Sequence, residues 1–271
     1  MNEADKRAIV AKLEKHVALK GSQKKASNSL EGVSSATINK MLNGAWDDIA
    51  ETMWRKLAGQ LGNPTEATWR IAPTKAYRKM TFLLSEAQRN SLTLAIVGSA
   101  GIGKSEAVKQ YTATHANVYH IACAEFWRKK VFVQKLLQSL GEAVQGGTIE
   151  DLMDVAITAI SKKEKPLIVL DEADKLSDPV LYFFITLYNL LEGRCGLVIQ
   201  STNFLEKRIL RGLSLGKKGY EEIYSRLGRH FIRLDAVDDE DIALVCTENG
   251  VANINTIRKI TKESDYDLRM V

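Results

Sequence analysis

The chain has 271 residues, 45% hydrophobic and 26% charged, which excludes a largely disordered or collagen-like protein. The net charge of +5, from 38 basic and 33 acidic residues, does not by itself identify a partner. Three distant cysteines and four scattered histidines predict neither a disulfide framework nor a metal site. The N-terminus lacks a signal peptide and the longest apolar stretch is too short for a bilayer, so we expect a cytoplasmic protein without membrane contact.

Residues 1–62 predict a small all-α domain. Apolar Ile9, Val10, Leu13 and Val17 recur at helical spacing between residues 4 and 19. Further short helices are expected at 22–30, 36–42 and 47–61, and residues 63–73 are expected to form a linker.

From residue 74 to residue 234, apolar strands alternate with amphipathic helices. This pattern predicts an α/β domain, with a parallel sheet covered by helices on both faces. Strands are expected at 92–97, 117–122, 166–170 and 196–201, and helices at 74–90, 131–140, 149–162 and 178–191. The acidic run at 238–241 suits the N-terminus of a helix, so residues 235–271 are expected to be helical.

A glycine-rich phosphate-binding pattern follows the first predicted strand. Residues 98–105, GSAGIGKS, fit GxxxxGK[ST] and open a predicted helix. Glycines allow backbone N–H groups to surround phosphate oxygens, and the helix N-terminus adds positive potential. Lys104 is expected to reach the β- and γ-phosphates of ATP, and the Ser105 hydroxyl to bind Mg²⁺. The predicted ATP-binding residues are Gly98, Ser99, Ala100, Gly101, Ile102, Gly103, Lys104, Ser105 and Glu106.

Polar side chains also follow two later strands. Asp171 and Glu172 end the apolar run 167–170, at the sheet edge where α/β proteins bind ligands. We expect Asp171 to hold Mg²⁺ and Glu172 to polarise the attacking water. Asn203 follows the strand 196–201, where its amide could contact the γ-phosphate or the water.

Basic residues are concentrated in two parts of the chain, as expected if the partner is a polyanion. Residues 1–62 hold ten Lys and Arg against seven Asp and Glu, and residues 205–233 hold eight against three. The alternative is a set of solvated faces. The expected phosphate contacts of double-stranded DNA are Arg128, Lys129 and Lys130, and then, in a loop after residue 203, Lys207, Arg208, Arg211, Lys217 and Lys218.

These motifs, in this order and spacing, resemble those of an AAA+ ATPase over roughly residues 74–271. The resemblance implies an Mg²⁺-dependent ATPase with Lys104 and Ser105 in Walker A, Asp171 and Glu172 in Walker B, and Asn203 as sensor 1. Arg226 would be an arginine finger acting on a neighbouring copy, with Arg229 as the alternative. Arg269, in a segment resembling the sensor 2 helix, would touch the γ-phosphate. Most of the family's lid is missing, so residues 235–271 would form a partial helical lid.

The N-terminal segment resembles a helix-turn-helix of the λ-repressor kind. Ser22-Gln23 would open its second helix, Gly32-Val33-Ser34 would form the turn, and residues 35–44 would form the recognition helix. The side chains expected to reach DNA are Ser35, Thr37, Asn39 and Lys40. The alternative is a helical bundle that binds protein.

A helix-turn-helix before one AAA+ domain resembles the family of transposition ATPases that includes phage Mu transposition protein B and the IstB type. The resemblance implies ATP-dependent, largely sequence-independent binding of double-stranded DNA as a helical filament. Such a filament marks target DNA and recruits and stimulates a DDE-type transposase, and ATP hydrolysis disassembles it.

Two other functions remain open at this point. A helicase loader has a similar core, but a DNA-binding domain in front argues against that function. A nucleotide-switched transcriptional regulator would bind one operator-like sequence, but it has no need for a water-activating carboxylate such as Glu172.

Overall fold

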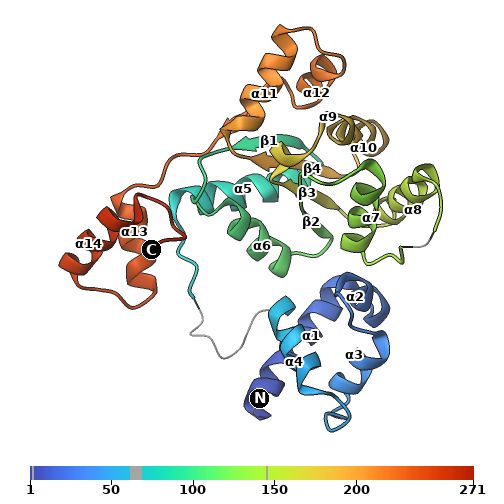
Figure 1. The fold of residues 1–271 in the computed structure, drawn as a ribbon, viewed down its shortest axis with the longest axis vertical. Helices are drawn as coiled ribbons and strands as arrows, with labels where there is room; N and C mark the ends of the chain where they lie inside the picture. The colour runs from blue at the N-terminus through green and yellow to red at the C-terminus, as the bar shows by residue number, and fades with distance from the viewer. Residues whose placement is uncertain (2, 62–68, 145) are drawn as a thin grey trace.

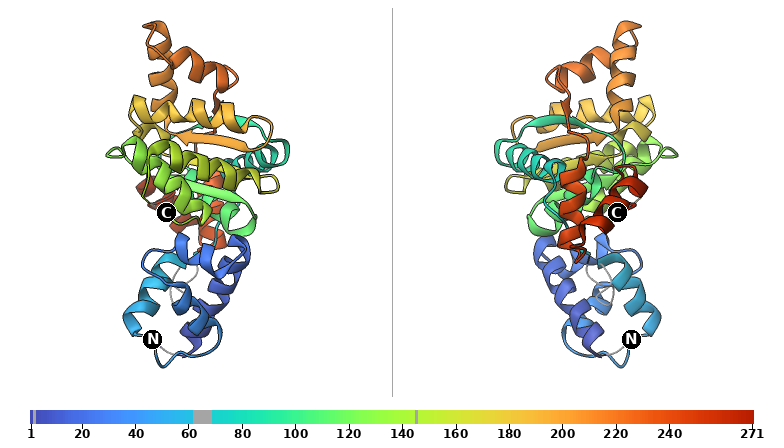
Figure 2. Two further views of the ribbon diagram at one scale, coloured as in Figure 1. Left: turned by 90° about the vertical axis from the view of Figure 1, so that its right-hand side faces the viewer. Right: turned by 90° about the vertical axis from the view of Figure 1, so that its left-hand side faces the viewer.

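The computed structural model describes residues 1, 3–61, 69–144 and 146–271. The N-terminal helices lie at one end of an elongated molecule, and the α/β core occupies its middle (Figure 1). Two further views show the same division, with the C-terminal helices beside the core (Figure 2). Among the described helices, none is long and apolar enough to cross a membrane.

The N-terminal helices enclose a core of their own. The hydroxyls of Ser22 and Ser34 cap the second and third helices by accepting backbone N–H groups. The fourth helix begins at Glu51, because residues 47–49, expected to be helical, form a turn instead. The helices are α1 (Glu3–Lys20), α2 (Gln23–Ser29), α3 (Ser35–Leu42) and α4 (Glu51–Leu61), and their fully buried side chains include Ile9, Leu13, Ile38, Met41, Trp54 and Leu57.

The α/β core contains one parallel sheet with the strand order β2-β3-β4-β1-β5. This sheet and the helices on both of its faces confirm the predicted fold class. Every residue of β3 and β4 is buried, which explains why these strands are continuous apolar runs. The strands are β1 (Thr93–Val97), β2 (Val118–Ala122), β3 (Leu167–Asp171), β4 (Gly196–Ser201) and β5 (Ile232–Arg233).

Alternate residues of the strands point into two separate apolar layers. Ile96 and Val169 face the layer of α5 (Lys75–Asn90) and α6 (Lys104–Thr114). Val97 and Leu170 face the layer on the other side. The predicted helix 178–191 is divided at Tyr182 into two helices. The elements on this second side are α7 (Lys129–Leu140), α8 (Ile149–Ser161), the 3₁₀ turn η1 (Ala173–Lys175), α9 (Asp178–Leu181) and α10 (Phe183–Leu191).

The loop expected after residue 203 is wrong for Lys207, Arg208 and Arg211, which lie on the helix α11 (Asn203–Ser214), whereas Lys217 and Lys218 do lie in a loop. Thr202 caps the helix, and Leu205 and Ile209, four residues apart, are fully buried on one of its faces. Gly212 lets Tyr220 of α12 (Tyr220–Arg226) pack closely, since a Cβ there would lie 2.2 Å from the Tyr220 ring. The chain continues through α13 (Asp239–Glu248) and α14 (Ile254–Ser264).

The N-terminal helices contact the core at the C-terminal end of α7. Lys25 Nζ lies 2.6 Å from Glu142 Oε1, and Asn28 Nδ2 donates a hydrogen bond to Gly141 O at 3.1 Å. Lys20 Nζ donates to Ser139 O at 2.8 Å. The three contacted groups lie within residues 139–142, so these polar contacts join the two regions through one short segment of the chain.

Candidate nucleotide site

The predicted phosphate-binding loop connects β1 to α6. Gly101 and Gly103 have φ angles of 77° and 89°, a left-handed conformation that favours glycine. Gly103 is the N-cap of α6, so the free N–H groups of that helix face the loop. Lys104 Nζ donates to Gly98 O at 2.8 Å and to Ser99 O at 2.7 Å. The lysine therefore folds back across the loop and adds positive charge beside the helix N-terminus.

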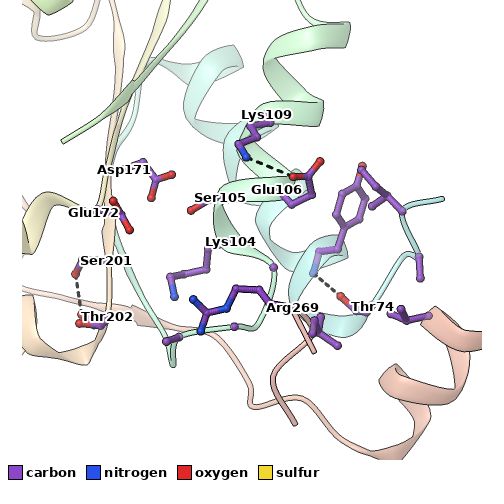
Figure 3. Close-up of a pocket in the computed structure, with 18 of the residues that line it drawn as sticks. Thr74, Lys104, Ser105, Glu106, Lys109, Asp171, Glu172, Ser201, Thr202 and Arg269 are labelled. Carbon is purple, nitrogen blue, oxygen red and sulfur yellow. Dashed lines mark hydrogen bonds and ion pairs between the residues drawn. The ribbon is translucent and has the colours of Figure 1, made fainter. Parts of the chain in front are cut away.

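This loop borders a cavity of about 450 Å³ (Figure 3). The cavity brings together residues that are distant in sequence: the loop, the carboxyl ends of β3 and β4, the segment 69–77, α13 and the C-terminal segment. The predicted site residues that line it are Ala100, Gly101, Gly103, Lys104, Ser105, Glu106, Asp171, Glu172 and Arg269. Among the predicted ATP-binding and catalytic residues, Gly98, Ser99, Ile102, Asn203 and Arg226 lie outside its lining.

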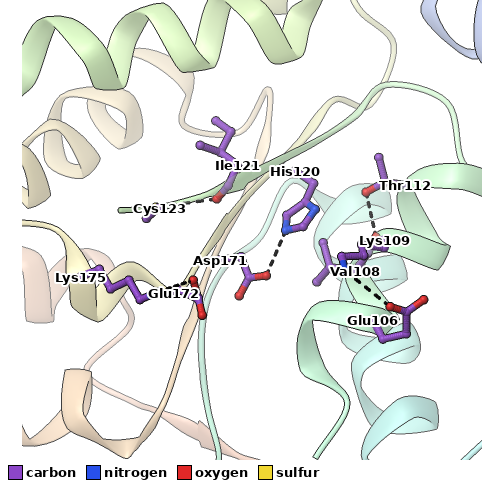
Figure 4. A network of polar contacts seen from close by, with 10 residues as sticks. All are labelled: Glu106, Val108, Lys109, Thr112, His120, Ile121, Cys123, Asp171, Glu172 and Lys175. Atoms are coloured by element: carbon purple, nitrogen blue, oxygen red, sulfur yellow. Dashed lines mark hydrogen bonds and ion pairs between the residues drawn. The ribbon is translucent and has the colours of Figure 1, made fainter. Parts of the chain in front are cut away.

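Asp171 is held in place at the buried end of β3. His120 Nε2 of the neighbouring strand β2 lies 3.0 Å from Asp171 Oδ2, and the two side chains are 15% and 4% exposed (Figure 4). Burial acts to raise the pKa of Asp171, but hydrogen bonds from His120 and Ser105 outweigh it and leave the pKa below its ordinary value. Asp171 is therefore a carboxylate at neutral pH, beside the Ser105 hydroxyl.

Glu172 reaches the cavity from a turn. Its φ of 54° ends the strand abruptly and places its carboxylate outside the sheet. Lys175 Nζ, one turn later, lies 2.6 Å from Glu172 Oε2, and this hydrogen bond raises the pKa of Lys175. Both side chains are about half exposed, so the pair is accessible to water.

The end of β4 departs from the sequence prediction at one position. Ser201 and Thr202 line the cavity, whereas Asn203 is the first residue of α11 and is exposed. Thr202 Oγ1 donates to Asp174 Oδ2 at 2.9 Å. Because helix formation starts one residue after Thr202, Thr202 is better placed than Asn203 for the polar contact expected here.

A buried amide lies behind these groups. Gln200 is 0% exposed, on β4, one residue beyond the paired Leu170 and Ile199. Its amide lies near Asp171 and lowers the pKa of that carboxyl, yet neither amide atom has a hydrogen-bond partner of good geometry. A buried polar group without a partner marks a place for a bound polar species.

Arg269 lines the cavity without belonging to a helix. The predicted sensor 2 helix is wrong, because α14 ends at Ser264 and the positive φ angles of Asp265 and Tyr266 turn the chain back. Leu268 N then donates to Gly101 O at 3.0 Å, which ties the C-terminal segment to the phosphate-binding loop. Arg269 forms an ion pair with Asp267, and its charge acts to lower the pKa of Lys104, although burial is the larger cause.

Sequence reasoning missed the apolar wall of the cavity. The only signal for this wall was a short, mostly apolar stretch, residues 69–72, at the end of the predicted linker 63–73. Residues 63–68 of that linker lie outside the described residues. An apolar surface beside a phosphate-binding loop suits the flat ring of a nucleobase. The wall contains Trp69, Ile71, Ala72, Tyr77, Val245 and Leu268.

The donor groups present fit Mg²⁺ bound together with a nucleotide. In the described part of the chain there is no group of three His, Cys, Asp or Glu that could hold a metal by itself. Ser105 and Asp171 supply a hydroxyl and a buried carboxylate that lie close to each other. Mg²⁺ typically binds one or two such protein ligands and takes its remaining ligands from water and phosphate oxygens.

Most of the predicted DNA-binding side chains are exposed. Those of Ser35, Asn39, Lys40, Arg128, Lys129, Lys130, Lys207, Arg211, Lys217 and Lys218 belong to this group, and Thr37 is half-buried. Arg208 is an exception and a correction: its side chain is 17% exposed and donates to Asp174 O, Leu176 O, Asp178 Oδ1 and Tyr220 Oη. All of these acceptors are internal, so Arg208 holds α11 against the loop after β3.

The two candidate finger residues differ in their contacts. Arg226 Nε donates to Asn189 Oδ1 at 3.1 Å, and its guanidinium lies over the Tyr188 ring at 5.1 Å from the centroid. Arg229 is exposed and has a φ of 56°. Both lie at the end of α12, away from the cavity of the same chain, so a role for either in hydrolysis requires a second copy.

Comparison with known proteins agrees with the geometry of the core. Residues 87–201 match the family model described as "AAA domain". No curated protein matches the sequence. Among the solved structures, the chain is similar to one described as "Structure of Drosophila ORC bound to DNA", with 12% identity and a TM-score of 0.47. That match covers 72% of this chain and 51% of the other, so the chain spans about half of it. Residues 87–201, which contain the phosphate-binding loop and strands β1 to β4, are therefore similar to an AAA domain, and the parallel order of these strands fits the similarity.

Proposed function

We propose that this protein is an Mg²⁺-dependent ATPase that assembles on double-stranded DNA without sequence preference and serves DNA transposition. One observation carries the proposal: Lys104, Ser105, Asp171 and Glu172 converge on one cavity that also has an apolar wall. No simpler ligand than a nucleoside triphosphate uses a phosphate loop, a metal-binding carboxylate and a second carboxylate together.

The side chains divide the work of hydrolysis. Lys104 would exchange its bonds to Gly98 O and Ser99 O for phosphate oxygens. Asp171 and Ser105 would hold Mg²⁺, which neutralises phosphate charge when bound. Glu172 would leave Lys175 and accept a hydrogen bond from the attacking water, which aligns it with the γ-phosphate. Thr202 would contact the same phosphate.

The assembly part of the proposal rests on where Arg226 and Arg229 lie. An arginine that completes a neighbour's site makes subunit contact depend on ATP. A head-to-tail contact of this kind is heterologous and extends into a filament if the rotation does not close. Exposed lysines and arginines supply phosphate contacts that do not depend on sequence, which suits selection of a transposition target. The assembled protein would then recruit the DDE-type transposase.

The decisive test separates binding from hydrolysis. Glu172→Gln keeps the shape of the side chain but removes the charge that polarises water, so ATP turnover should fall by about 100-fold while ATP affinity stays within about twofold. Phosphate release and equilibrium dialysis measure the two quantities. Glu150→Gln, an exposed change on α8, is the matched control. Normal turnover in the Glu172 variant would rule out the assignment.

Electron microscopy tests the assembly. Filaments should form on duplex DNA of arbitrary sequence with ATP, and they should persist longer with the Glu172→Gln protein. If only one operator-like sequence is bound and no oligomer forms with ATP, the protein is a nucleotide-switched regulator instead. If the protein serves transposition, addition of a DDE-type transposase should raise strand transfer into the coated DNA.

A further inference from the structure

A second cavity lies between the N-terminal helices and the core. Its volume is about 580 Å³, and α1, the end of α4, α6 and β2 form its walls. Figure 1 shows α1 directly beneath α6 and β2, with the nucleotide loop at the other end of α6. One wall is a single face of α1, because its contributing residues are spaced three and four apart: Lys12, Lys15, His16, Leu19 and Lys20.

The charge of this cleft comes from lysines. Four lysines and three histidines line it, and no Asp or Glu is among its described lining residues, although His120 lies 3.0 Å from the Asp171 carboxylate behind it. From α1 come Lys12, Lys15, His16 and Lys20, and from the core come Lys109, His115 and His120.

The described partners of Lys20 and Lys109 compensate their charge only weakly. Lys20 Nζ donates to a backbone carbonyl, Ser139 O, which carries no net charge. Lys109 Nζ is 3.7 Å from Glu106, in an exposed pair of the kind that contributes little. The carboxylate of Glu142, nearby, is engaged by Lys25. The cleft therefore concentrates positive potential between two low-dielectric walls.

The titration of two lining groups agrees with this potential. Burial, and next the charge of Lys20, lower the pKa of His16 to about 4. Burial, and next the charge of Lys163, lower the pKa of Lys20 to about 8. Burial is the larger cause in each case and leaves His16 neutral at pH 7. The charge of Lys163 opposes the protonation of Lys20, so a bound anion would offset that repulsion.

We propose that this cleft is a second anion-binding site, separate from the nucleotide cavity, which binds consecutive phosphate groups. Lysines bind phosphate groups as point charges, and several lysines along one wall can contact successive phosphates. Its volume suits a small polyphosphate or a few backbone phosphates of DNA. The inference does not depend on hydrolysis at the other site.

Calorimetry with inorganic tripolyphosphate tests the site directly. The titration uses the full chain carrying Lys104→Ala, which weakens binding at the nucleotide loop. Lys15→Glu should weaken tripolyphosphate binding by about tenfold, because a charge within a few ångströms of the anion is reversed. Lys15→Ala should give a smaller loss in the same direction. Lys24→Glu is the matched control: it makes the same change on α2 at an exposed residue outside the cleft, and its effect should stay below about twofold.

Anisotropy measurements with a labelled duplex, in the protein with native Lys104 and ATP, identify the source of the phosphates. If the DNA backbone occupies the cleft, Lys15→Glu weakens duplex binding and reduces the salt slope by about one, unlike Lys24→Glu. If the occupant is a soluble polyphosphate, only the tripolyphosphate titration separates the two variants. The proposal is overturned if neither ligand distinguishes Lys15→Glu from Lys24→Glu while both proteins keep the circular dichroism of the parent. Loss of ATP turnover would leave this result unchanged.

Discussion

The nucleotide cavity and the N-terminal helices differ in how their polar side chains are held. In the cavity, Asp171 is buried and hydrogen-bonded, and Lys104 is fixed by two carbonyl groups. On α3, the side chains expected to reach DNA are mostly exposed and bond only to near neighbours, as Lys40 does to Asp48. Burying a polar group costs free energy unless the group is paired. The contacts of a buried polar side chain therefore indicate its role, whereas the contacts of an exposed side chain do not.

The comparison predicts that the strongest functional effect comes from the cavity. Lys104→Ala should reduce ATP turnover to background and lower ATP affinity, because no other lysine is placed within the described loop to contact the phosphates. A phosphate-release assay and a fluorescent ATP analogue measure the two effects. Lys135→Ala on α7, an exposed lysine outside the cavity, should behave as the parent does. An equal loss of ATP turnover in both variants would show that the cavity lysine has no special role.

Substitutions in the core of the N-terminal helices should lower the stability of these helices rather than ATP turnover. Trp54 is 0% exposed and packs edge-on against Trp46, so Trp54→Ala should destabilise these helices by about 3–5 kcal/mol. Urea unfolding followed by circular dichroism measures the loss. Trp54→Phe should cost much less, because the indole N–H has no hydrogen-bond partner in the native chain. ATP turnover without DNA should stay within about twofold, and a larger loss would show that the two regions are coupled.

Two arginines on α11 sharpen the comparison within one helix. Arg208→Ala removes four internal hydrogen bonds and leaves Asp178 without its cationic partner, with only Tyr220 Oη donating to it, so the core should lose about 3 kcal/mol of stability. Arg211→Ala, at an exposed position one turn later, should leave the melting temperature unchanged and weaken DNA binding modestly. Differential scanning calorimetry and anisotropy separate the two effects. If Arg208→Ala melts with the parent, its contacts are not stabilising.

The smallest effect concerns pH and the N-terminal helices. The pKa of His16 is lowered from 6.5 to about 4 by burial and by Lys20, so below pH 6.5 the unfolded chain binds a proton that the folded chain does not. Stability from this group is therefore complete above pH 6.5 and falls as the pH drops toward 4, by about 2 kcal/mol between pH 7 and pH 5. Urea unfolding at several pH values measures the slope. His16→Asn should flatten it, and an unchanged slope would contradict the assignment.

The sequence predicted the phosphate-binding and carboxylate parts of the cavity, because fixed spacing encodes them. A phosphate-binding loop between a strand and a helix needs its residues in consecutive order, so Lys104 and Ser105 could be placed from the chain alone. The place of Asn203 and the expected helix around Arg269 differ, because both depend on where a helix starts or ends. One-residue shifts at helix ends depend on tertiary contacts, such as Thr202 with Asp174 and Leu268 with Gly101.

The rest could not be read from the chain because it depends on contacts distant in sequence. The apolar wall joins Trp69 to Val245, and the anion cleft joins α1 to α6 and β2. Arg208 looked like a surface charge because basic residues surround it in sequence, yet its acceptors lie about 30 residues earlier. Burial of a charged residue follows from packing, which local composition does not reveal.

Because Leu268 N donates a hydrogen bond to Gly101 O, the position of the C-terminal segment and the shape of the phosphate-binding loop depend on each other. A nucleotide that reshapes the loop must therefore also change the energy of the segment that ends α14. Linkage is reciprocal, so any partner that pulls this segment away from Gly101 changes nucleotide affinity by the same factor. An external contact with residues 265–271 would thus change the affinity of the cavity for ATP.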